Sequence, residues 1–503
     1  MCRHCDAGRR QPNLTSRRTF LKATASTGIA AAGWGLFGSS TADAQTTAAP
    51  SGSGKPGRRY VIRGGAVLSM DPGVGDFTQA AVLVEGKKIV AVGPKLEVPG
   101  AAVIDARGKI VMPGFIDTHH HQFETALRGF LADGLLANDG KPHGAINYFD
   151  YVLGKFAPVY RAQDVYINEL FGSLSQLDAG VTTGHDISQI HHSPEHSDAA
   201  IKGLTDAGRR AVFGYFEGQG EKTRYPGDAA RIKTQYFSSD DQLVTMMMGG
   251  EIYRPGYEKA WEIGRRLNLP IAAHIVGPLG MSETFDKLAT AGQFGPDNLF
   301  IHMTGISETG WKAVKDAGAG VSIAFPIEMT MRHGMPPILK SLEMGIEPSL
   351  SVDVECTMTA DFFTQLRSAM TLQRALVNQM AIEGRKDLPE LLTSRDVIRF
   401  ATLQGAKDLK LDRKVGSLTP GKEADILLLA ADAINVAPLN HVPGAVVTLM
   451  ERSNVETVIV AGKVRKWQGC LLDVDLRKLR MELEASRDYL FKAAGVKTDL
   501  FRA

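Results

Sequence analysis

The chain contains 503 residues, which is enough for two domains or for one large barrel with additions. Its formal net charge of +2 gives no reason to expect nucleic acid or a membrane surface as a partner. With 44% hydrophobic residues and 53 glycines, the composition is typical of an α/β protein with many tight loops.

The N-terminal segment has the pattern of an export signal. Arg17 and Arg18 precede a mildly apolar stretch rich in alanine and glycine, and an Ala-Asp-Ala sequence ends at Ala44. These features predict that residues 1–44 direct export by the twin-arginine machinery. A disordered basic tail is the alternative, and the stretch is too rich in glycine for a membrane anchor. We therefore expect a periplasmic or secreted protein, with a flexible linker over residues 45–57.

Both ends of the remaining chain have the pattern of short strands. Residues 58–113 and 414–470 alternate apolar and polar side chains between glycine-containing turns. This alternation predicts antiparallel strands that assemble one small β-sandwich domain from the two chain ends. Residues 471–503 contain leucines at helical spacing, which predicts a C-terminal helix packed on the body.

The middle of the chain, residues 114–413, has a different sequence pattern. Eight short apolar runs, from "FIDTHHH" to "PSLSVDVE", alternate with segments that include amphipathic helices. Eight strand–helix units over about 300 residues predict an α/β fold of the (β/α)8 type, the TIM barrel. A doubly wound sheet is the rival architecture, but no glycine fingerprint follows the first strand.

Metal-competent side chains fall where the barrel strands are expected to end. Along the chain, these residues are His119, His121, His185, Glu217, His274, His302 and Asp353. Active sites of TIM barrels lie at the C-terminal ends of the strands. The pattern therefore predicts that these side chains meet at one mouth of the barrel.

Two of three consecutive histidines are expected to bind one ion. Side chains at i and i+2 of a strand point to the same side, so His119 and His121 can hold a metal together. His120 faces the other way and is assigned to packing or to a hydrogen bond behind the site. His274 and Asp353 are the further candidate ligands. The fourth run, "LVTMMMGGEIY", has no lysine that would bridge two ions, so we expect a single metal.

Several segments resemble the amidohydrolase superfamily, namely "PGFIDTHHH", "PIAAHIVG", "LFIHMTG", "SLSVDVE" and "ATLQGAKDLKLDRKVGSLTPGKEADILLL". The most similar branch is the mononuclear one, which contains cytosine deaminases, aminohydrolases and chlorohydrolases. The resemblance implies that His119, His121, His274 and Asp353 bind one divalent metal, zinc or alternatively iron. It also implies that His302 polarises or holds the attacking water or the substrate, and that Asp353 shuttles the proton.

The chemistry of this set predicts a hydrolase. A divalent metal lowers the pKa of its bound water to about 7 and so provides a nucleophile. Asp353 can accept a proton from that water and return it to a leaving nitrogen, while His302 can donate a hydrogen bond to developing negative charge. We therefore expect an enzyme that cleaves a C–N bond in an amide, a urea or a carbamate-like small molecule.

One position departs from the deaminase pattern. Deaminases of this branch carry a glutamate three residues after the histidine of the fifth strand, whereas this chain has Gly277 there. Glu217, Glu251 and Glu328 are the candidate replacements. The alternatives that stay open are a deaminase or chlorohydrolase acting on a nitrogen heterocycle, and a non-catalytic metal-binding relative.

Further residues are expected to contact the substrate. His185 and Glu217 end the second and third runs, and the segment after the seventh run, "FPIEMTMRHGMPP", contains Glu328 and His333. Loops at this end of a barrel set substrate specificity. His185, Glu217, Glu328 and His333 are therefore the predicted substrate-binding residues. A homodimer is the default expectation for the oligomeric state.

Overall fold

The structure, a computed structural model, describes residues 48–501. The predicted export signal over residues 1–44 lies outside the described residues and stays a prediction. Between residues 48 and 501, no helix is both long and apolar enough to cross a membrane.

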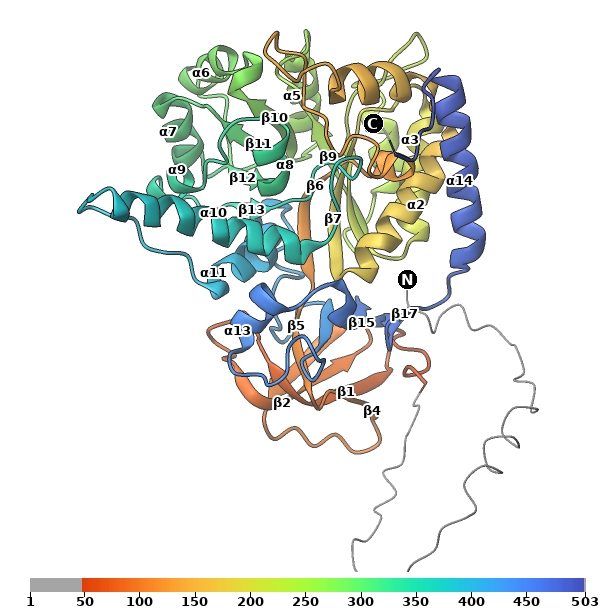
Figure 1. Cartoon of the computed structure of the whole chain (residues 1–503). Helices are drawn as coiled ribbons and strands as arrows, with labels where there is room; N and C mark the ends of the chain where they lie inside the picture. The colour runs from red at the N-terminus through yellow and green to blue at the C-terminus, as the bar shows by residue number, and fades with distance from the viewer. Residues whose placement is uncertain (1–47, 502–503) are drawn as a thin grey trace, which may run out of the picture.

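The middle of the chain forms a barrel of eight parallel strands, which confirms the predicted fold class (Figure 1). The strands follow the chain order: β6 (Phe115–His120), β7 (Val181–Ser188), β8 (Arg210–Tyr215), β9 (Val244–Gly249), β10 (Ile271–Val276), β11 (Asn298–Thr304), β12 (Gly320–Ile323) and β13 (Ser349–Leu350). Residues of β7, β8, β10 and β11 are buried on both faces, as expected for a parallel sheet covered by helices.

The barrel closes just beyond the hydrogen-bonded strand ends. The backbone N–H of Asp353 donates to the carbonyl of His119, and the N–H of His121 donates to the carbonyl of Asp353, both at 2.9 Å. These bonds join the end of β6 to the segment that follows β13. Barrel closure thus brings the first and last of the predicted metal ligands together.

Helices cover the outside of the barrel (Figure 1). They are α2 (Ala162–Asp178), α3 (Pro194–Asp206), α4 (Ala229–Tyr236), α5 (Tyr257–Arg266), α6 (Ser282–Thr290), α7 (Glu308–Ala317), α8 (Phe325–Thr330), α9 (Ile338–Glu343), α10 (Phe362–Ile382), α11 (Ser394–Arg399) and α12 (Gly405–Asp408). The predicted C-terminal helix is α14 (Leu476–Ala493), which lies along α2 and bonds to it through Ser486 and Asp164, 2.8 Å apart.

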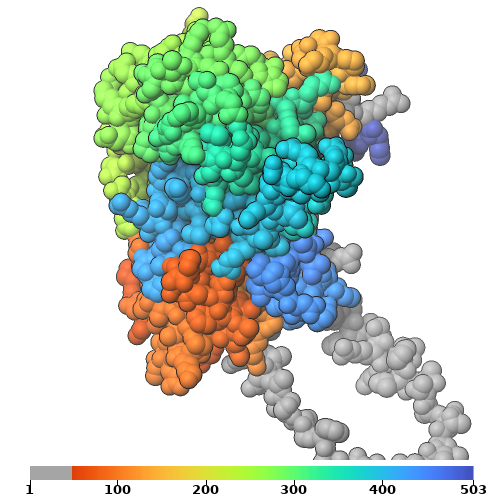
Figure 2. All heavy atoms as spheres, turned by 90° about the vertical axis from the view of Figure 1, so that its left-hand side faces the viewer, coloured from red at the N-terminus to blue at the C-terminus, as the bar shows by residue number. Residues whose placement is uncertain are grey.

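Both chain ends contribute to one separate sheet of nine strands. These are β1 (Arg59–Val67), β2 (Phe77–Glu85), β3 (Lys88–Gly93), β4 (Ala102–Asp105), β5 (Lys109–Pro113), β14 (Ile426–Ala430), β15 (Val455–Val460), β16 (Lys463–Trp467) and β17 (Cys470–Leu471). The two ends meet where β14 pairs with β5. Figure 2 shows these red and blue segments together at one end of the molecule.

The pairing within this sheet differs from the antiparallel expectation. Strand β1 pairs in parallel with both β4 and β5, so the sheet is mixed. The sheet also curls, because Ile89 of β3 exchanges backbone hydrogen bonds with Gly421 and Lys422 ahead of β14. One curled sheet therefore encloses its own apolar core, which includes Val82 and Leu428.

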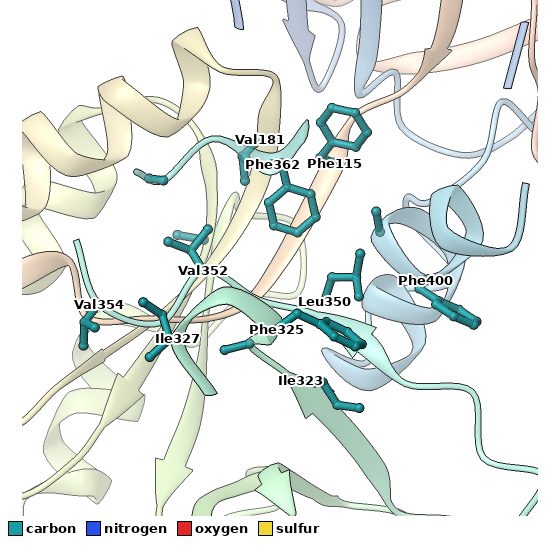
Figure 3. Packing of buried hydrophobic residues seen from close by; sticks show 14 of the residues in the cluster. Phe115, Val181, Ile323, Phe325, Ile327, Leu350, Val352, Val354, Phe362 and Phe400 are labelled. Atoms are coloured by element: carbon teal, nitrogen blue, oxygen red, sulfur yellow. The ribbon is translucent and has the colours of Figure 1, made fainter. Parts of the chain in front are cut away.

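The barrel core extends outward beneath the closing strands (Figure 3). Phe115 of β6 stacks on Phe362 at 5.6 Å and meets Phe363 edge-on at 5.2 Å. Both partners open α10, whose first turn is capped by the Asp361 side chain. The apolar start of α10 thereby covers the base of β6 and fixes the strand that carries the histidines.

A buried ion pair joins the barrel to the sheet domain. Arg210, the first residue of β8, lies 2.7 Å from Glu423 and 3.0 Å from Asp425, and all three side chains are buried. The two carboxylates outweigh the effect of burial and raise the pKa of Arg210. Removing one partner of such a cluster leaves uncompensated charge in the interior.

Replacement of Arg210 by methionine should lower the free energy of unfolding by about 3–5 kcal/mol, because Glu423 and Asp425 would remain buried without a counter-charge. Chemical denaturation followed by circular dichroism measures this loss. Arg107→Met is the matched control, since its ion pair with Asp105 is exposed and its removal should leave stability nearly unchanged. Equal losses in both variants would contradict this role.

Candidate active site

Four predicted ligands converge at the C-terminal mouth of the barrel. The Nε2 atom of His119 lies 3.0 Å from Oδ1 of Asp353 and 3.3 Å from Nε2 of His274. The Nε2 atom of His121 lies 3.3 Å from the same carboxylate oxygen. All four side chains are buried. The structure thus gathers into one cluster residues that are up to 234 positions apart in the chain.

The cluster fits a single tetrahedral metal ion. Zinc–nitrogen bonds of about 2.0–2.1 Å at tetrahedral angles place neighbouring ligand atoms about 3.3 Å apart. The separations around His119 are 3.0 and 3.3 Å, although no ion holds them. Three imidazoles and one carboxylate are donors that suit zinc or iron. The ligand atoms of His119, His121 and His274 lie within 4.8 Å of one another, and so do those of His119, His302 and Asp353, so the residues present suit a metal in chemistry and in the spacing around His119.

The two oxygens of Asp353 face different partners. Oδ1 faces the imidazoles of His119 and His121, whereas Oδ2 faces Nε2 of His302 at 3.7 Å and Nε2 of His333 at 3.9 Å. Oδ2 is buried and has no hydrogen-bond partner within the described residues. One carboxylate can therefore contact a metal through one oxygen and handle a proton through the other.

Two residues of this site have an unusual backbone conformation. Asp353 has a φ of +69° and His302 a φ of +72°, in the left-handed region that residues with a Cβ atom rarely adopt. Such strain persists only where surrounding contacts hold the backbone in place. For Asp353 these contacts are the two backbone bonds to β6 that close the barrel.

A buried glutamate stands behind each of two site histidines. Nδ1 of His274 lies 2.5 Å from Oε1 of Glu251, and Nδ1 of His302 lies 2.9 Å from Oε1 of Glu328. Glu251 follows β9, and Glu328 belongs to α8. Because each glutamate engages Nδ1, it leaves Nε2 of its histidine facing the cluster.

Burial and neighbouring charge set the protonation of the cluster. Burial holds the pKa of His119 well below its usual range and lowers the pKa of His302 to about 4, so both rings are neutral at pH 7. For Asp353, burial favours the acid, but the surrounding His119, His121 and His302 hold its pKa well below the usual range. Neutral His119 and His302 thus lie beside an ionised carboxylate. Asp353 outweighs the effect of burial on His121 and raises its pKa to about 9, so His121 must release a proton to bind a metal.

His120 differs from its two neighbours. Its ring is fully buried, and neither ring nitrogen has a hydrogen-bond partner within the described residues. Burial lowers its pKa to about 3. Of the two roles that were predicted for it, packing and a hydrogen bond behind the site, the structure shows packing.

The predicted substrate-binding residues separate into two groups. His333 lines a cavity beside the cluster. His185, Glu217 and Glu328 do not line it, and their assignment as substrate contacts stays a prediction. His185 bonds to the carbonyl of Thr118 at 2.9 Å. Glu328 is held behind His302, as described above.

Glu217 forms a buried support rather than a contact surface. The hydroxyl of Tyr253 donates to its Oε1 atom at 3.2 Å, and the guanidinium of Arg254 pairs with the same oxygen at 3.1 Å. Tyr253 itself lines the cavity. Tyr148 and Gln189 also line it. The sequence pattern did not identify these three residues, because uncharged residues in long connections carry no periodic or metal-binding signal.

The backbone around Gly277 explains the absent glutamate. A Cβ atom at this position would lie 2.6 Å from the carbonyl oxygen of Gly305 and 2.7 Å from that of Thr304. Backbone atoms at such distances cannot yield as a flexible side chain would. The fold therefore leaves no room for any side chain at Gly277.

The fold and this cluster define a (β/α)8 hydrolase with a candidate metal centre. A model of the amidohydrolase family matches residues 110–465, so the chain belongs to the amidohydrolase family. It is thus an amidohydrolase-type enzyme that acts by hydrolysis.

Curated relatives of similar length include two kinds of deaminase. The chain is 27% identical to the 5'-deoxyadenosine deaminase of Methanosarcina mazei, over 86% of this chain and 98% of that protein. It is 26% identical to the 5-methylthioadenosine/S-adenosylhomocysteine deaminase of Carboxydothermus hydrogenoformans, over 80% and 92% of the two chains.

Solved structures share the fold at lower identity. An adenosine deaminase from Xanthomonas campestris with bound zinc superposes with a TM-score of 0.75 at 21% identity, covering 87% of this chain and 99% of that chain. Atrazine chlorohydrolase from Arthrobacter aurescens complexed with zinc superposes with a TM-score of 0.74 at 21% identity, covering 85% of this chain and 100% of that chain.

Adjacent histidines on one strand provide a direct test of the cluster. His119→Ala should lose most of the bound metal, because its Nε2 atom faces both Asp353 and His274. His120→Ala should keep the metal, because its ring lies outside the cluster. Elemental analysis of both purified proteins measures their metal content, and thermal unfolding confirms that each variant is folded. A metal-free His120 variant beside a metal-loaded His119 variant would show that the wrong histidines were assigned.

Proposed function

We propose that this protein hydrolyses a C–N bond of an amide, urea or carbamate-like small molecule at a single divalent metal. His119, His121, His274 and Asp353 would hold the ion, with zinc as the first candidate and iron as the alternative. The tetrahedral spacing of their ligand atoms supports the single ion. Bound zinc in two of the structural neighbours supports the choice of metal.

The side chains around the cluster have separate tasks in this proposal. A bound metal would supply a Lewis acid and a water of lowered pKa. Oδ2 of Asp353 faces away from the ligand histidines, so it can accept a proton from the attacking water. The same atom then returns that proton to the leaving nitrogen. Asp353 therefore acts as both base and acid.

His302 is placed to donate a hydrogen bond to the oxygen that gains negative charge. Burial holds the pKa of Glu328 well above its usual range, which favours the protonated carboxyl, and in this proposal that carboxyl donates to Nδ1 of His302. The neutral ring then carries its own proton on Nε2, which lies on the side of Asp353. A hydrogen bond to a developing oxyanion is a strong source of catalysis in a dry site.

The observation that carries this reaction class is that none of the described residues lining the cavity is a glutamate. Gly277 excludes the expected acid by backbone crowding. Its three candidate replacements are engaged elsewhere: Glu251 with His274, Glu328 with His302, and Glu217 with Tyr253. Hydrolysis of an amide does not require an acid that protonates a ring nitrogen, because Asp353 can protonate the leaving nitrogen.

A heterocycle deaminase is the second candidate. Relatives with 26–27% identity are named as deaminases of adenine nucleosides, and one structural neighbour is a chlorohydrolase. In such a reaction the polar side chains of the cavity would have to replace the glutamate. A non-catalytic relative is disfavoured, because all four ligand residues and His302 are present and gathered.

The products distinguish these candidates. The zinc-loaded protein should release amines from a panel of amides, ureas and carbamates, and should release little ammonia from 5'-deoxyadenosine. Asp353→Asn should reduce turnover at least about 100-fold, because it removes the proton acceptor. Chromatographic detection of the amine and an enzymatic ammonia assay measure the two outcomes. Fast ammonia release with no cleavage of any amide-type compound would favour the deaminase.

The two buried glutamates should affect different steps. Glu251→Met should lower metal affinity by about 10–100-fold, because it frees the ligand His274. Glu328→Met should lower kcat and leave the metal content unchanged, because His302 is not a ligand in this proposal. Metal titration and steady-state kinetics on both variants measure these effects. Metal loss in the Glu328 variant would show that His302 is a ligand and that a second ion binds.

A further inference from the structure

The cavity beside the cluster contains almost no charge. Of the described side chains that line it, Asp353 is the only carboxylate, and none is a lysine or an arginine. Asp353 already faces the imidazoles of the cluster. A substrate that enters this cavity therefore meets no counter-charge beyond the metal site itself.

Two apolar walls enclose the space. One wall comes from the long connection between β6 and α2 and includes Leu136, Phe149 and Leu153. The last two belong to η2 (Phe149–Phe156), a π-helical segment. Such segments are frequent at functional sites.

The second wall adjoins the first, because the backbone N–H of Leu136 donates to the carbonyl of Met331 at 2.9 Å. It includes Val276 at the end of β10, Leu279 and Met281 just beyond it, and Met331 after α8. Methionine side chains adapt to ligands of different shape. Together the two walls offer a hydrocarbon surface to the part of the substrate that does not react.

The arginines next to cavity residues are already paired. Arg254 follows the cavity residue Tyr253 and pairs with Glu217 at 3.1 Å. Arg332 lies between two cavity residues and pairs with Asp139 at 2.9 Å. Neither is available to a carboxylate or phosphate of a ligand without breaking an ion pair. Transfer of an unpaired charge into such a space is costly.

Three uncharged polar groups line the cavity. Oε1 of Gln189 and Nδ1 of His333 are buried and make no hydrogen bond within the described residues, whereas the hydroxyl of Tyr148 has the buried carboxyl of Glu124 as its neighbour. Tyr148 lies beside His121, with ring centroids 6.0 Å apart, and His333 lies beside His302 at 4.8 Å. These groups therefore flank the cluster on two sides. A few placed polar groups in an apolar pocket are typical of recognition of an uncharged ligand.

We infer that the substrate is an uncharged carboxamide with hydrocarbon groups on it. This inference rests on the proposed C–N hydrolysis. Tyr148, Gln189 and His333 supply the hydrogen bonds to the polar part, and the two apolar walls bind the hydrocarbon part. A substrate with a carboxylate, a phosphate or a polyhydroxylated sugar is disfavoured, because its polar groups would lose water without gaining partners.

The reaction then has a defined balance. The oxygen of water forms a bond to the carbonyl carbon, the C–N bond breaks, and a proton reaches the leaving nitrogen through Asp353. The products are an amine and a carboxylic acid, which ionises on release. Among the described residues that line the cavity, none is a lysine or an arginine that would pair with that anion.

A matched pair of chromogenic amides tests the inference. Hexanoyl para-nitroanilide and adipoyl mono-para-nitroanilide have acyl chains of equal length, but the second ends in a carboxylate. With the zinc-loaded full-length protein, kcat/KM should be roughly 100-fold higher for the uncharged compound. Release of nitroaniline is followed by absorbance. Equal kcat/KM values for the two compounds would overturn the inference and leave the proposed hydrolysis intact.

A cation added to the wall should reverse part of this preference. Leu153→Arg should raise kcat/KM for the carboxylated anilide and lower it for the uncharged one. Leu279→Arg, on the second wall, repeats the test if the first variant is unstable to heat. Ile382→Arg is the control for adding an arginine, because Ile382 is 80% exposed and lies outside the cavity. An unchanged preference in both stable wall variants would contradict the assignment of these walls.

The failure of the proposed function would give a different result. In that case neither anilide would be cleaved by the zinc-loaded protein, while ammonia would be released from 5'-deoxyadenosine. If the protein released ammonia from 5'-deoxyadenosine and also cleaved both anilides at equal rates, only the choice of an uncharged, apolar substrate would be refuted.

Discussion

Closure of the barrel between its first and last strands is the constraint on which the site depends. The backbone of Asp353 exchanges hydrogen bonds with the backbone of His119 and His121. The bonds that complete the cylinder are therefore the bonds that place three candidate ligands side by side. They also hold Asp353 at a φ of +69°, which an isolated segment would not keep. Stability of the fold and geometry of the site thus share one set of contacts.

The buried carboxylates around the site each contact particular histidines. Glu251 and Glu328 are each committed to the Nδ1 atom of a histidine, and Asp353 presents one oxygen to the cluster and one to His302. Each buried acid therefore has a defined partner, as the cost of burying charge requires. The consequence is a cavity with apolar walls. Crowding of the backbone at Gly277 removes the one further carboxylate that a deaminase of this branch would place there.

Much of the architecture and of the cluster follows from local sequence patterns. Eight apolar runs predict eight buried strands, and His119 and His121 at i and i+2 must share a side of their strand. Positions at strand ends of a TIM barrel converge, so His274 and Asp353 could be assigned without coordinates. The separate sheet was also predicted from both chain ends. Its parallel pairing was not, because alternation specifies a strand but not the direction of its neighbour.

The sequence by itself determined the barrel, the histidine pair and the absence of the fifth-strand glutamate. Tertiary structure decided that Glu217 and Glu328 lie behind the site and that Tyr148 lies in the cavity. It also decided that no lysine or arginine lies among the described residues that line the cavity. The physical reason is distance along the chain: ligand positions follow from the regular period of a strand, whereas loop side chains are placed by packing against segments hundreds of residues away.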